Sequence, residues 1–407
     1  MSQSTLSVTG SKTPRGRSSM RLPKVLLSVG VLLIVLGVIA VYALPALAVK
    51  YPGGPLNKTA HAQGTFTLYI DPASAAPLPT PQKLPLDIKR NLHVIETDGS
   101  RAVVQENDVE QIGTLKPQDL QQRYVLDRKS LKNVADDRAW AYTPSNKIDR
   151  SPAYSINLPF SSGKGPYQVW KNESGVSYAF TKTASVKRGG VTLYRYQGSM
   201  NGAPAQGYYI DQLASQGIPK SLTPTQAAAQ LKAQGADPAL LETAVLPSLA
   251  PLDRSTAQTI LAQNVPLKYS IDVHTSFLVE PKTGAIVGLE QIDQTLYATP
   301  DIQGIGRIQT ILNKPQYAKN AVIQSAAAVI GKLVKNPPRS KIFNITYAQL
   351  PASVDDLATF AKGRADKITL AKVTLPSAIG GAGVVVVLIA VGFGWRARRN
   401  HHQEMPA

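Results

Sequence analysis

Residues 25–49 read VLLSVGVLLIVLGVIAVYALPALAV, a run without a charged side chain. A helix needs about 20 apolar residues to cross the roughly 30 Å hydrocarbon core of a bilayer, so this run predicts a membrane span. The segment before it, residues 1–24, holds five basic residues and no acidic one. Because positively charged flanks stay on the cytoplasmic side, residues 1–24 are predicted to form a basic cytoplasmic tail.

A second apolar run lies near the other end of the chain. Residues 375–395 read LPSAIGGAGVVVVLIAVGFGW, and three arginines follow within residues 396–407. The same charge rule predicts a second span with a cytoplasmic tail after it. The two spans are expected to lie in the plasma membrane. Because both ends of the chain are inside, residues 50–374 are expected to lie outside the cytoplasm.

The first span has an alternative interpretation. Ala46, Leu47 and Ala48 form the A-x-A pattern of a signal-peptidase site behind a basic start. The apolar run is longer than the roughly 7 to 15 residues of a signal peptide, which favours a retained span. Cleavage after Ala48 would still leave the middle of the chain outside.

Small residues recur at a spacing of four in the second span. Ser377 and Gly381 form one such pair, and Ala378 and Ala382 form another. This spacing lets helices approach closely, either against the first span or against a second copy of the chain. A homo-oligomer formed through the spans is therefore one expectation.

The composition limits the partners. The chain has 44 basic and 26 acidic residues, for a net charge of +18, and no cysteine, which excludes disulfides and thiolate metal sites. The terminal tails account for seven of these charges, so the central segment is basic in its own right. Outside the cytoplasm, this charge indicates either a solvated basic surface or binding to anionic lipid or an envelope polymer; nucleic acid is not an expected partner.

Period-two patterns predict an antiparallel sheet in the central segment. Apolar or β-branched residues occupy every second position from Tyr269 to Val279, and a turn at residues 280–284 leads into a returning strand. Two further hairpins are predicted, with turns at residues 188–190 and 98–99. The turns after Leu126 and after Val279 both contain an acid-x-Lys-hydroxyl step, which indicates either a duplicated hairpin or shared turn chemistry.

Helices are predicted to be fewer. Thr223 and Pro224 favour a helix start, and residues 220–265 are predicted to form a helical insertion between strands. Further helices are expected over residues 317–334 and from Ser353 to Asp366, the latter leading to the second span. The predicted class is α+β: a β-rich antiparallel extracytoplasmic domain, with a curved sheet or half-barrel and covering helices, between two transmembrane helices.

No motif for catalysis, cofactor binding or metal binding emerges. No histidine has metal-ligand spacing within a helix, and Asp136 and Asp137 beside Arg138 indicate a salt-bridged surface patch. Gly163 and Lys164 lack the remaining residues of a phosphate-binding loop. We therefore expect a protein that is not an enzyme, with no catalytic, cofactor-binding or metal-binding residues; its solvated histidines are His61, His93, His274, His401 and His402.

Several segments resemble one known family, the actinobacterial PorA-type (porin PorA) envelope proteins. They are Trp140–Tyr142, Asn157–Phe160, Tyr167–Trp170, Tyr194–Tyr196 and the hairpin Phe277–Gly284, framed by the two spans. The likeness covers most of residues 25–399; where the family's first acidic turn often has glycine, this chain has Leu131.

The resemblance implies a cell-wall porin. The alternation of the strands predicts a water-soluble core instead, because a membrane β-barrel needs an apolar outward band. The leading hypothesis is an envelope protein that binds a lipid, polymer or partner protein outside the membrane. The alternatives are a channel-forming oligomer and, less favoured, an envelope hydrolase in which His93 or His274 joins a serine and a carboxylate.

Overall fold

A computed structural model describes residues 21–51, 58–72, 74–233, 238–301 and 303–402. The chain forms two compact units, one made of residues 1–50 and 364–407 and the other of residues 51–363. Most of the predicted N-terminal tail and the last five residues of the C-terminal tail lie outside the described residues.

The first unit is a pair of long helices, α1 (Arg21–Ala48) and α9 (Leu375–His402). Each has 28 residues and is therefore about 42 Å long at 1.5 Å per residue. Both contain the predicted spans, and both are long and apolar enough to cross a membrane. A short π-helical turn (Leu370–Thr374) connects α9 to the preceding helix α8 (Pro351–Thr369).

Helices α1 and α9 pack against each other in antiparallel directions along a seam of glycines. A Cβ atom added at Gly30 would lie 2.6 Å from Val387, and one added at Gly37 would lie 2.9 Å from the Cα of Gly380. Small residues at such positions let two helix backbones approach closely in a membrane. The amino end of α1 and the carboxyl end of α9 are therefore at the same end of the pair.

The small-residue pairs singled out in the sequence do not form this seam. Ser377, Ala378, Gly381 and Ala382 are all exposed, and nothing lies within 4 Å of a Cβ built at Gly381. The second span does pack on the first, which is one of the two predicted arrangements. These pairs lie on another face of the helix and do not make the contact with the first span; their packing against a second copy of the chain stays a prediction.

The seam predicts that Gly37→Leu destabilises the helix pair. The added side chain has no room beside Gly380, and overpacking of this kind costs about 1–3 kcal/mol. Thermal unfolding of the helices, followed by circular dichroism in detergent, measures the effect. Gly392→Leu is the matched control, because nothing lies within 4 Å of a Cβ at Gly392; equal midpoints for the two variants would contradict the seam.

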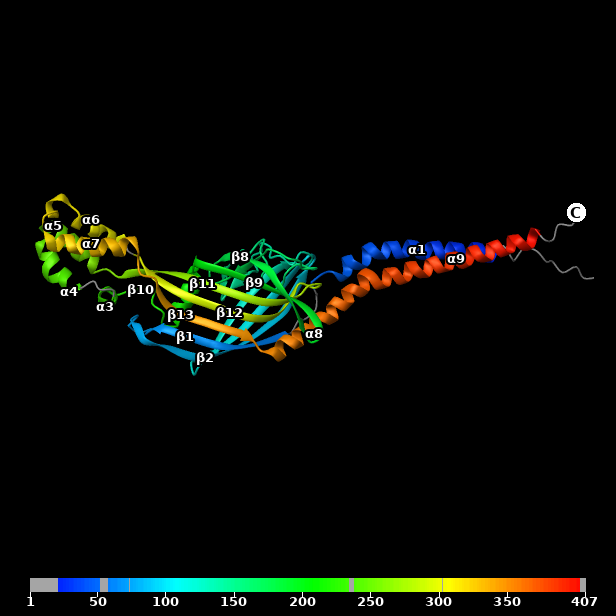
Figure 1. Ribbon diagram of the computed structural model, residues 1–407, viewed down its shortest axis with the longest axis horizontal. Coiled ribbons are helices and arrows are strands. Elements are labelled where there is room, and N and C mark those ends of the chain that lie inside the picture. The colour runs from blue at the N-terminus through cyan, green and yellow to red at the C-terminus, as the bar shows by residue number, and fades with distance from the viewer. Residues whose placement is uncertain (1–20, 52–57, 73, 234–237, 302, 403–407) are drawn as a thin grey trace, which may run out of the picture. The chain divides into compact units, whose positions relative to one another are not determined.

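The second unit is built on one antiparallel sheet (Figure 1). Its strand order is β6-β5-β4-β3-β2-β1-β13-β12-β11-β9-β8-β7, with β10 paired to β11. The three predicted hairpins are confirmed as β2–β3, β8–β9 and β11–β12. The strands are β1 (Lys58–Ile70), β2 (Pro77–Asp98), β3 (Arg101–Ile112), β4 (Gln118–Asp127), β5 (Trp140–Ala141), β6 (Thr143–Lys147), β7 (Tyr167–Lys171), β8 (Val176–Arg188), β9 (Val191–Pro204), β10 (Ser221–Leu222), β11 (Val265–Glu280), β12 (Ala285–Pro300) and β13 (Ser340–Gln349).

The sheet curves into a half-barrel around an aromatic core, as predicted. Strands near opposite ends of the sheet order share this core, because Tyr124 of β4 packs in the same cluster as Phe180 of β8 and Phe277 of β11. The rings of Phe180 and Phe277 are 4.7 Å apart. The period of two along the strands turns these aromatic side chains to the inner face. On the outer face, Leu193 and Leu278 are buried where α8 covers them.

The two edges of the sheet are joined by the segment between β6 and β7. Arg150 in this segment is only 1% exposed. Its guanidinium donates hydrogen bonds to the carbonyls of Arg123 and Trp140 on one side and to the Asn172 side chain, 2.8 Å away, on the other. One buried side chain thus ties the β4–β5 edge to the β7–β8 edge.

Helices occur at one end of the sheet and on its outer face. The predicted start at Thr223 is confirmed in α3. Helix α8 begins at Pro351, two residues before the predicted start at Ser353, whose hydroxyl accepts hydrogen bonds from the His61 N–H and the Gln349 amide. Helices α2 and α6 were not predicted. Helix α7 begins at Ala321 rather than near residue 317, because the Asn320 side chain caps it. The remaining helices are α2 (Gly207–Ser215), α3 (Pro224–Ala233), α4 (Pro238–Leu240), α5 (Pro251–Leu261), α6 (Gln303–Leu312) and α7 (Ala321–Lys335).

The two acid-x-Lys-hydroxyl turns have the same hydrogen bonding. Asp127 accepts the N–H of Ser130 at 2.7 Å, and Glu280 accepts the N–H of Thr283 at 2.8 Å. The next residue has a positive φ in both, 62° at Leu131 and 71° at Gly284. Leu131 holds a conformation that favours glycine, while its side chain is 1% exposed in the aromatic core.

Leu131→Gly is expected to lower the free energy of unfolding by about 1–3 kcal/mol. Relief of the left-handed backbone gains about 1–2 kcal/mol, but losing a buried leucine side chain costs more, about 2–5 kcal/mol. Urea denaturation followed by tryptophan fluorescence measures the change. A gain in stability would show that the backbone conformation outweighs the packing of Leu131.

Candidate functional site

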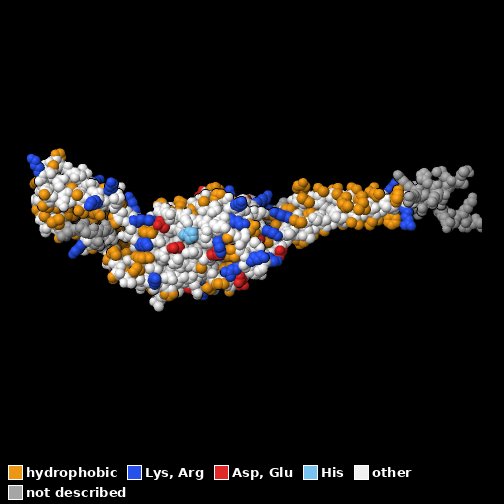
Figure 2. All heavy atoms as spheres, in the orientation of Figure 1, with side chains coloured by type: hydrophobic (Ala, Val, Ile, Leu, Met, Phe, Trp, Pro, Cys, Tyr) orange, Lys and Arg blue, Asp and Glu red, His pale blue; other side chains and the backbone are white. Residues whose placement is uncertain are grey.

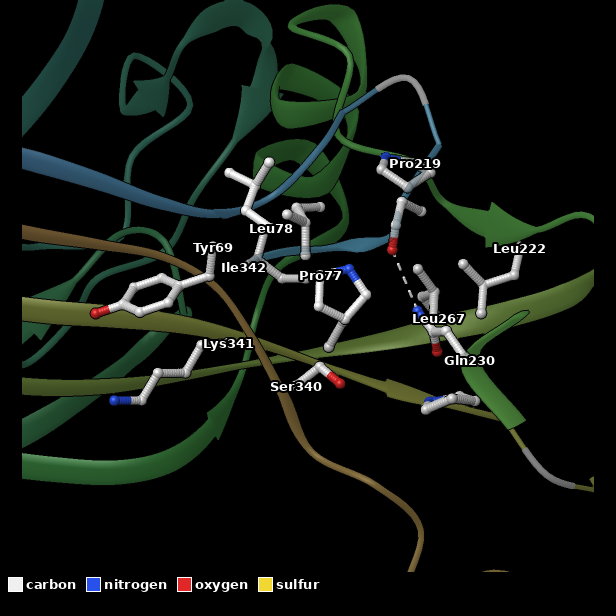
Figure 3. A pocket seen from close by; sticks show the side chains of 14 residues that line it. Tyr69, Pro77, Leu78, Pro219, Leu222, Gln230, Leu267, Ser340, Lys341 and Ile342 are labelled. Atoms are coloured by element: carbon white, nitrogen blue, oxygen red, sulfur yellow. Dashed lines mark hydrogen bonds between the residues drawn. The ribbon is translucent and has the colours of Figure 1, made fainter. Parts of the chain in front are cut away.

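A pocket of about 270 Å³ lies at one end of the half-barrel (Figure 3). Its residues come from both sides of the β1–β2 turn, from the segment between α2 and α3, from the ends of β11 and β12, and from the start of β13. Gln230 of α3 donates a hydrogen bond to the carbonyl of Ala75 in the β1–β2 turn. This contact holds the helix over the turn and closes one side of the pocket.

The wall of this pocket is apolar and well buried. Ile70, Leu222, Ala298 and Ile342 line it and are each 1–3% exposed. Ordinary ligand pockets are lined mainly by apolar side chains, with a few polar groups that set the orientation of the ligand. This wall is suited to an apolar group such as an alkyl chain.

One cation lies at the rim of the pocket. Lys341 is exposed, and its Nζ lies 5.4 Å from the centre of the Tyr69 ring. Figure 3 shows the Lys341 ammonium and the Tyr69 hydroxyl on the same side of the pocket. No carboxylate among the described residues forms an ion pair with Lys341 within 4 Å. The pocket therefore combines an apolar wall with an unpaired positive charge.

A second feature is a charged cluster on the inner face of the half-barrel. Arg90 of β2 forms salt bridges with Glu106 at 2.8 Å and with Asp108 at 2.9 Å, both on β3. The Tyr124 hydroxyl donates a hydrogen bond to Glu106 at 2.7 Å. Burying charges is costly unless they are paired and hydrogen-bonded. Here one guanidinium pairs with both carboxyl groups, and the Tyr124 hydroxyl adds a hydrogen bond to one of them.

The cluster shifts the protonation of its carboxyl groups. Burial, together with the nearby Glu106, raises the pKa of Asp108 to about 8, although Arg90 opposes the change. Burial and the charge of Glu173 raise the pKa of Glu110 to about 7. Near neutral pH the inner face therefore holds protons that the same side chains would release in water.

Glu110→Gln is expected to stabilise the domain at high pH only. The pKa of Glu110 is about 7 in the folded chain against an ordinary 4.5, so the unfolded chain loses this proton first and stability falls as the pH rises from about 4.5 to about 7. The amide at position 110 does not titrate, so the variant avoids this loss. Its free energy of unfolding should exceed that of the wild type by about 1 kcal/mol or more at pH 8 and should not differ below about pH 4.5.

Unfolding midpoints at the two pH values test this expectation. Glu242→Gln is the matched control, because Glu242 is exposed in the helical insertion. A gain for Glu110→Gln that is equal at both pH values would contradict the raised pKa.

The structure places the residues noted for chemistry on the outer surface. His274 Nδ1 lies 2.7 Å from the Ser199 hydroxyl on the neighbouring strand, and Asp293 is its partner in the β11–β12 register. This pair is exposed and does not line the pocket of Figure 3. Asp136 forms salt bridges with Arg101 and Arg138, at 2.8 Å each, as the surface-patch interpretation predicts.

No cluster of three or more histidine and acidic side chains that could hold a metal ion occurs among the described residues. Sequence reasoning missed both the pocket and the charged cluster. The cluster does have a signal in the sequence, because Glu106, Asp108 and Glu110 continue the period of two that Ala102 and Val104 begin.

These features define a membrane-associated protein with a β-rich domain between two apolar helices. The chain belongs to the Porin PorA family, whose family model matches residues 22–392. This match confirms the resemblance seen in the sequence. A search of curated proteins found no match.

Proposed function

We propose that this protein is an envelope membrane protein whose central domain, outside the cytoplasm, binds an amphiphilic lipid in the pocket of Figure 3. The observation that carries the proposal is the combination of a buried apolar wall with the unpaired Lys341 at its rim. An alkyl chain fits the wall, and an anionic headgroup complements the ammonium.

The position of the pocket supports this role. It lies at the β1–β2 turn and the start of β13, whereas Tyr51 and the start of α8 lie at the other end of the strands. β11 has 16 residues and is therefore about 50 Å long at 3.3 Å per residue. A lipid held there would be shielded far from the point where the chain leaves the domain toward its spans.

The same proposal includes the topology. Lys24 precedes the first span and Arg396 follows the second, and cationic flanks favour the cytoplasmic side. Both helices then cross the membrane with their domain-side ends outside. The antiparallel packing of α1 and α9 supports this arrangement.

Lys341→Glu is expected to abolish most co-purification of anionic lipid. The substitution places a carboxylate where the headgroup would lie, and like charges repel. Mass spectrometry of lipids extracted from the purified full-length protein measures bound lipid per chain. Lys83→Glu is the matched control, because Lys83 is exposed on β2 and does not line the pocket.

Two results would count against lipid binding. One is wild-type protein that carries no lipid beyond the annular lipid found on any membrane protein. The other is equal lipid retention in the two charge-reversal variants, which would show that Lys341 does not face the ligand.

The family name favours a second candidate, a channel-forming oligomer. Along β11, Ile271 and Val273 face the core at 0% and 3% exposure, while the polar Asp272 and His274 alternate with them. This part of the outer surface is therefore polar, unlike the apolar band of a membrane β-barrel. Ion conductance of the purified protein in planar bilayers, above that of the Gly37→Leu variant, would favour the channel over lipid binding.

We also propose that the protein is not an enzyme. The Ser199–His274 pair lies in β9 and β11, two strands hydrogen-bonded in the sheet, so few free N–H groups remain nearby to stabilise an oxyanion. Hydrolysis of ester substrates by wild type but not by Ser199→Ala would contradict this proposal.

A further inference from the structure

The end of the half-barrel from which the chain leaves for its two spans carries a rim of exposed cations. They lie in three turns: the turn after β4, the loop before β7 and the β8–β9 turn. Figure 2 shows several Lys and Arg side chains on this part of the domain. The basic rim consists of Lys129, Lys132, Lys164, Lys187 and Arg188, all exposed.

The chain that comes from the first span contacts this rim directly. The Tyr51 N–H donates to the carbonyl of Arg128 at 2.8 Å, and the Arg128 Nε donates back to the carbonyl of Tyr51 at 2.9 Å. Lys129 is the next residue. The turn that presents Lys129 and Lys132 is therefore bonded to Tyr51, three residues after the end of α1.

The helix that leads to the second span packs beside another part of the rim. Val354 and Ala358 of α8 share a core cluster with Val191 and Leu193, the first residues of β9. A Cβ built at Gly189, in the β8–β9 turn, would lie 3.8 Å from Thr359. Lys187 and Arg188 are thus held next to the second covalent connection to the membrane helices.

The acidic residues at this end do not neutralise the rim. Glu96 and Asp136 pair with Arg138, and Asp127 accepts hydrogen bonds from its own turn. Glu280 is buried in the turn that it stabilises. No carboxylate of a described residue lies within 4 Å of a cation of the rim. Asp98, Asp137 and Asp356 remain as exposed acids, fewer than the five cations.

We infer that the basic rim docks the central domain onto the anionic phospholipid headgroups of the membrane that its helices span. The covalent connections to both spans keep the rim at high effective concentration near the bilayer, so weak contacts suffice. Each Lys or Arg near an anionic surface adds on the order of a fivefold factor to the docking equilibrium. This inference requires the spans but does not depend on a ligand in the pocket.

The test uses the full-length chain in nanodiscs, either of phosphatidylcholine alone or of phosphatidylcholine and phosphatidylglycerol in equal parts. Mass spectrometry measures the acetylation rate of each lysine. Lys129, Lys164 and Lys187 are expected to react several-fold more slowly in the anionic nanodiscs, and high salt should remove the difference. Lys116, Lys232 and Lys319, at the other end of the domain or in its helical insertion, should react equally in both.

Two charge-reversal variants distinguish binding by the rim from a general attraction of a basic protein to anionic lipid. In Lys129→Glu/Lys187→Glu/Arg188→Glu, Lys164 should lose its protection. In the matched control Lys116→Glu/Lys232→Glu/Lys319→Glu, which removes the same charge, Lys164 should keep it. Equal rates in both nanodiscs, or retained protection of Lys164 in the rim variant, would overturn the inference, whatever lipid the pocket holds.

Discussion

The exclusion of charge from hydrocarbon is the constraint on which the rest of this structure depends. Helices α1 and α9 carry apolar side chains on nearly every exposed position, from Val25 to Val41 and from Val384 to Phe393. Such helices have no stable place in water except against other apolar surface. Because the two helices pack antiparallel through Gly30 and Gly37, the carboxyl end of α1 and the amino end of α9 lie at the same end of the helix pair. These are the two ends from which the chain continues into the central domain.

The central domain, in contrast, has to keep its apolar side chains away from water. Its aromatic core lies on the inner face, and the apolar residues of the outer face are covered by α8, so it folds as a water-exposed domain would. Closure around the aromatic core leaves the two sheet edges without a ladder between them. Arg150 bridges them with hydrogen bonds to backbone carbonyls rather than with an ion pair, which avoids the need to bury a second charge.

Those features of the fold that depend on residues close together in the sequence could be predicted from it. The β11–β12 hairpin was found because the period of two and the Glu280 turn are both encoded within about 30 residues, and the spans because their composition alone specifies them. Helix α2 was missed because Gly207 and Tyr208 favour other structures, and the burial of Tyr209 and Leu213 against distant strands stabilises the helix.

The candidate sites were less predictable than the fold. The pocket brings together residues as far apart as Tyr69 and Lys341, and no single-sequence pattern links positions at that separation. The contact of β2 with β3 that pairs Arg90 with Asp108 follows from a predicted hairpin, but their burial depends on strands from the other half of the chain. His61, His93 and His274, which were visible in the sequence, do not line the pocket.

Cysteine accessibility tests the central claim most directly, because the natural chain has no cysteine to confuse the result. Lys83→Cys and Lys319→Cys place single thiols in the central domain, and Ser4→Cys and Gln403→Cys place them in the terminal tails. Intact, wall-stripped cells are treated with a membrane-impermeant maleimide. The account predicts labelling of the two domain cysteines, with the tail cysteines labelled only after the membrane is permeabilised; labelled tails and a protected domain in intact cells would contradict it.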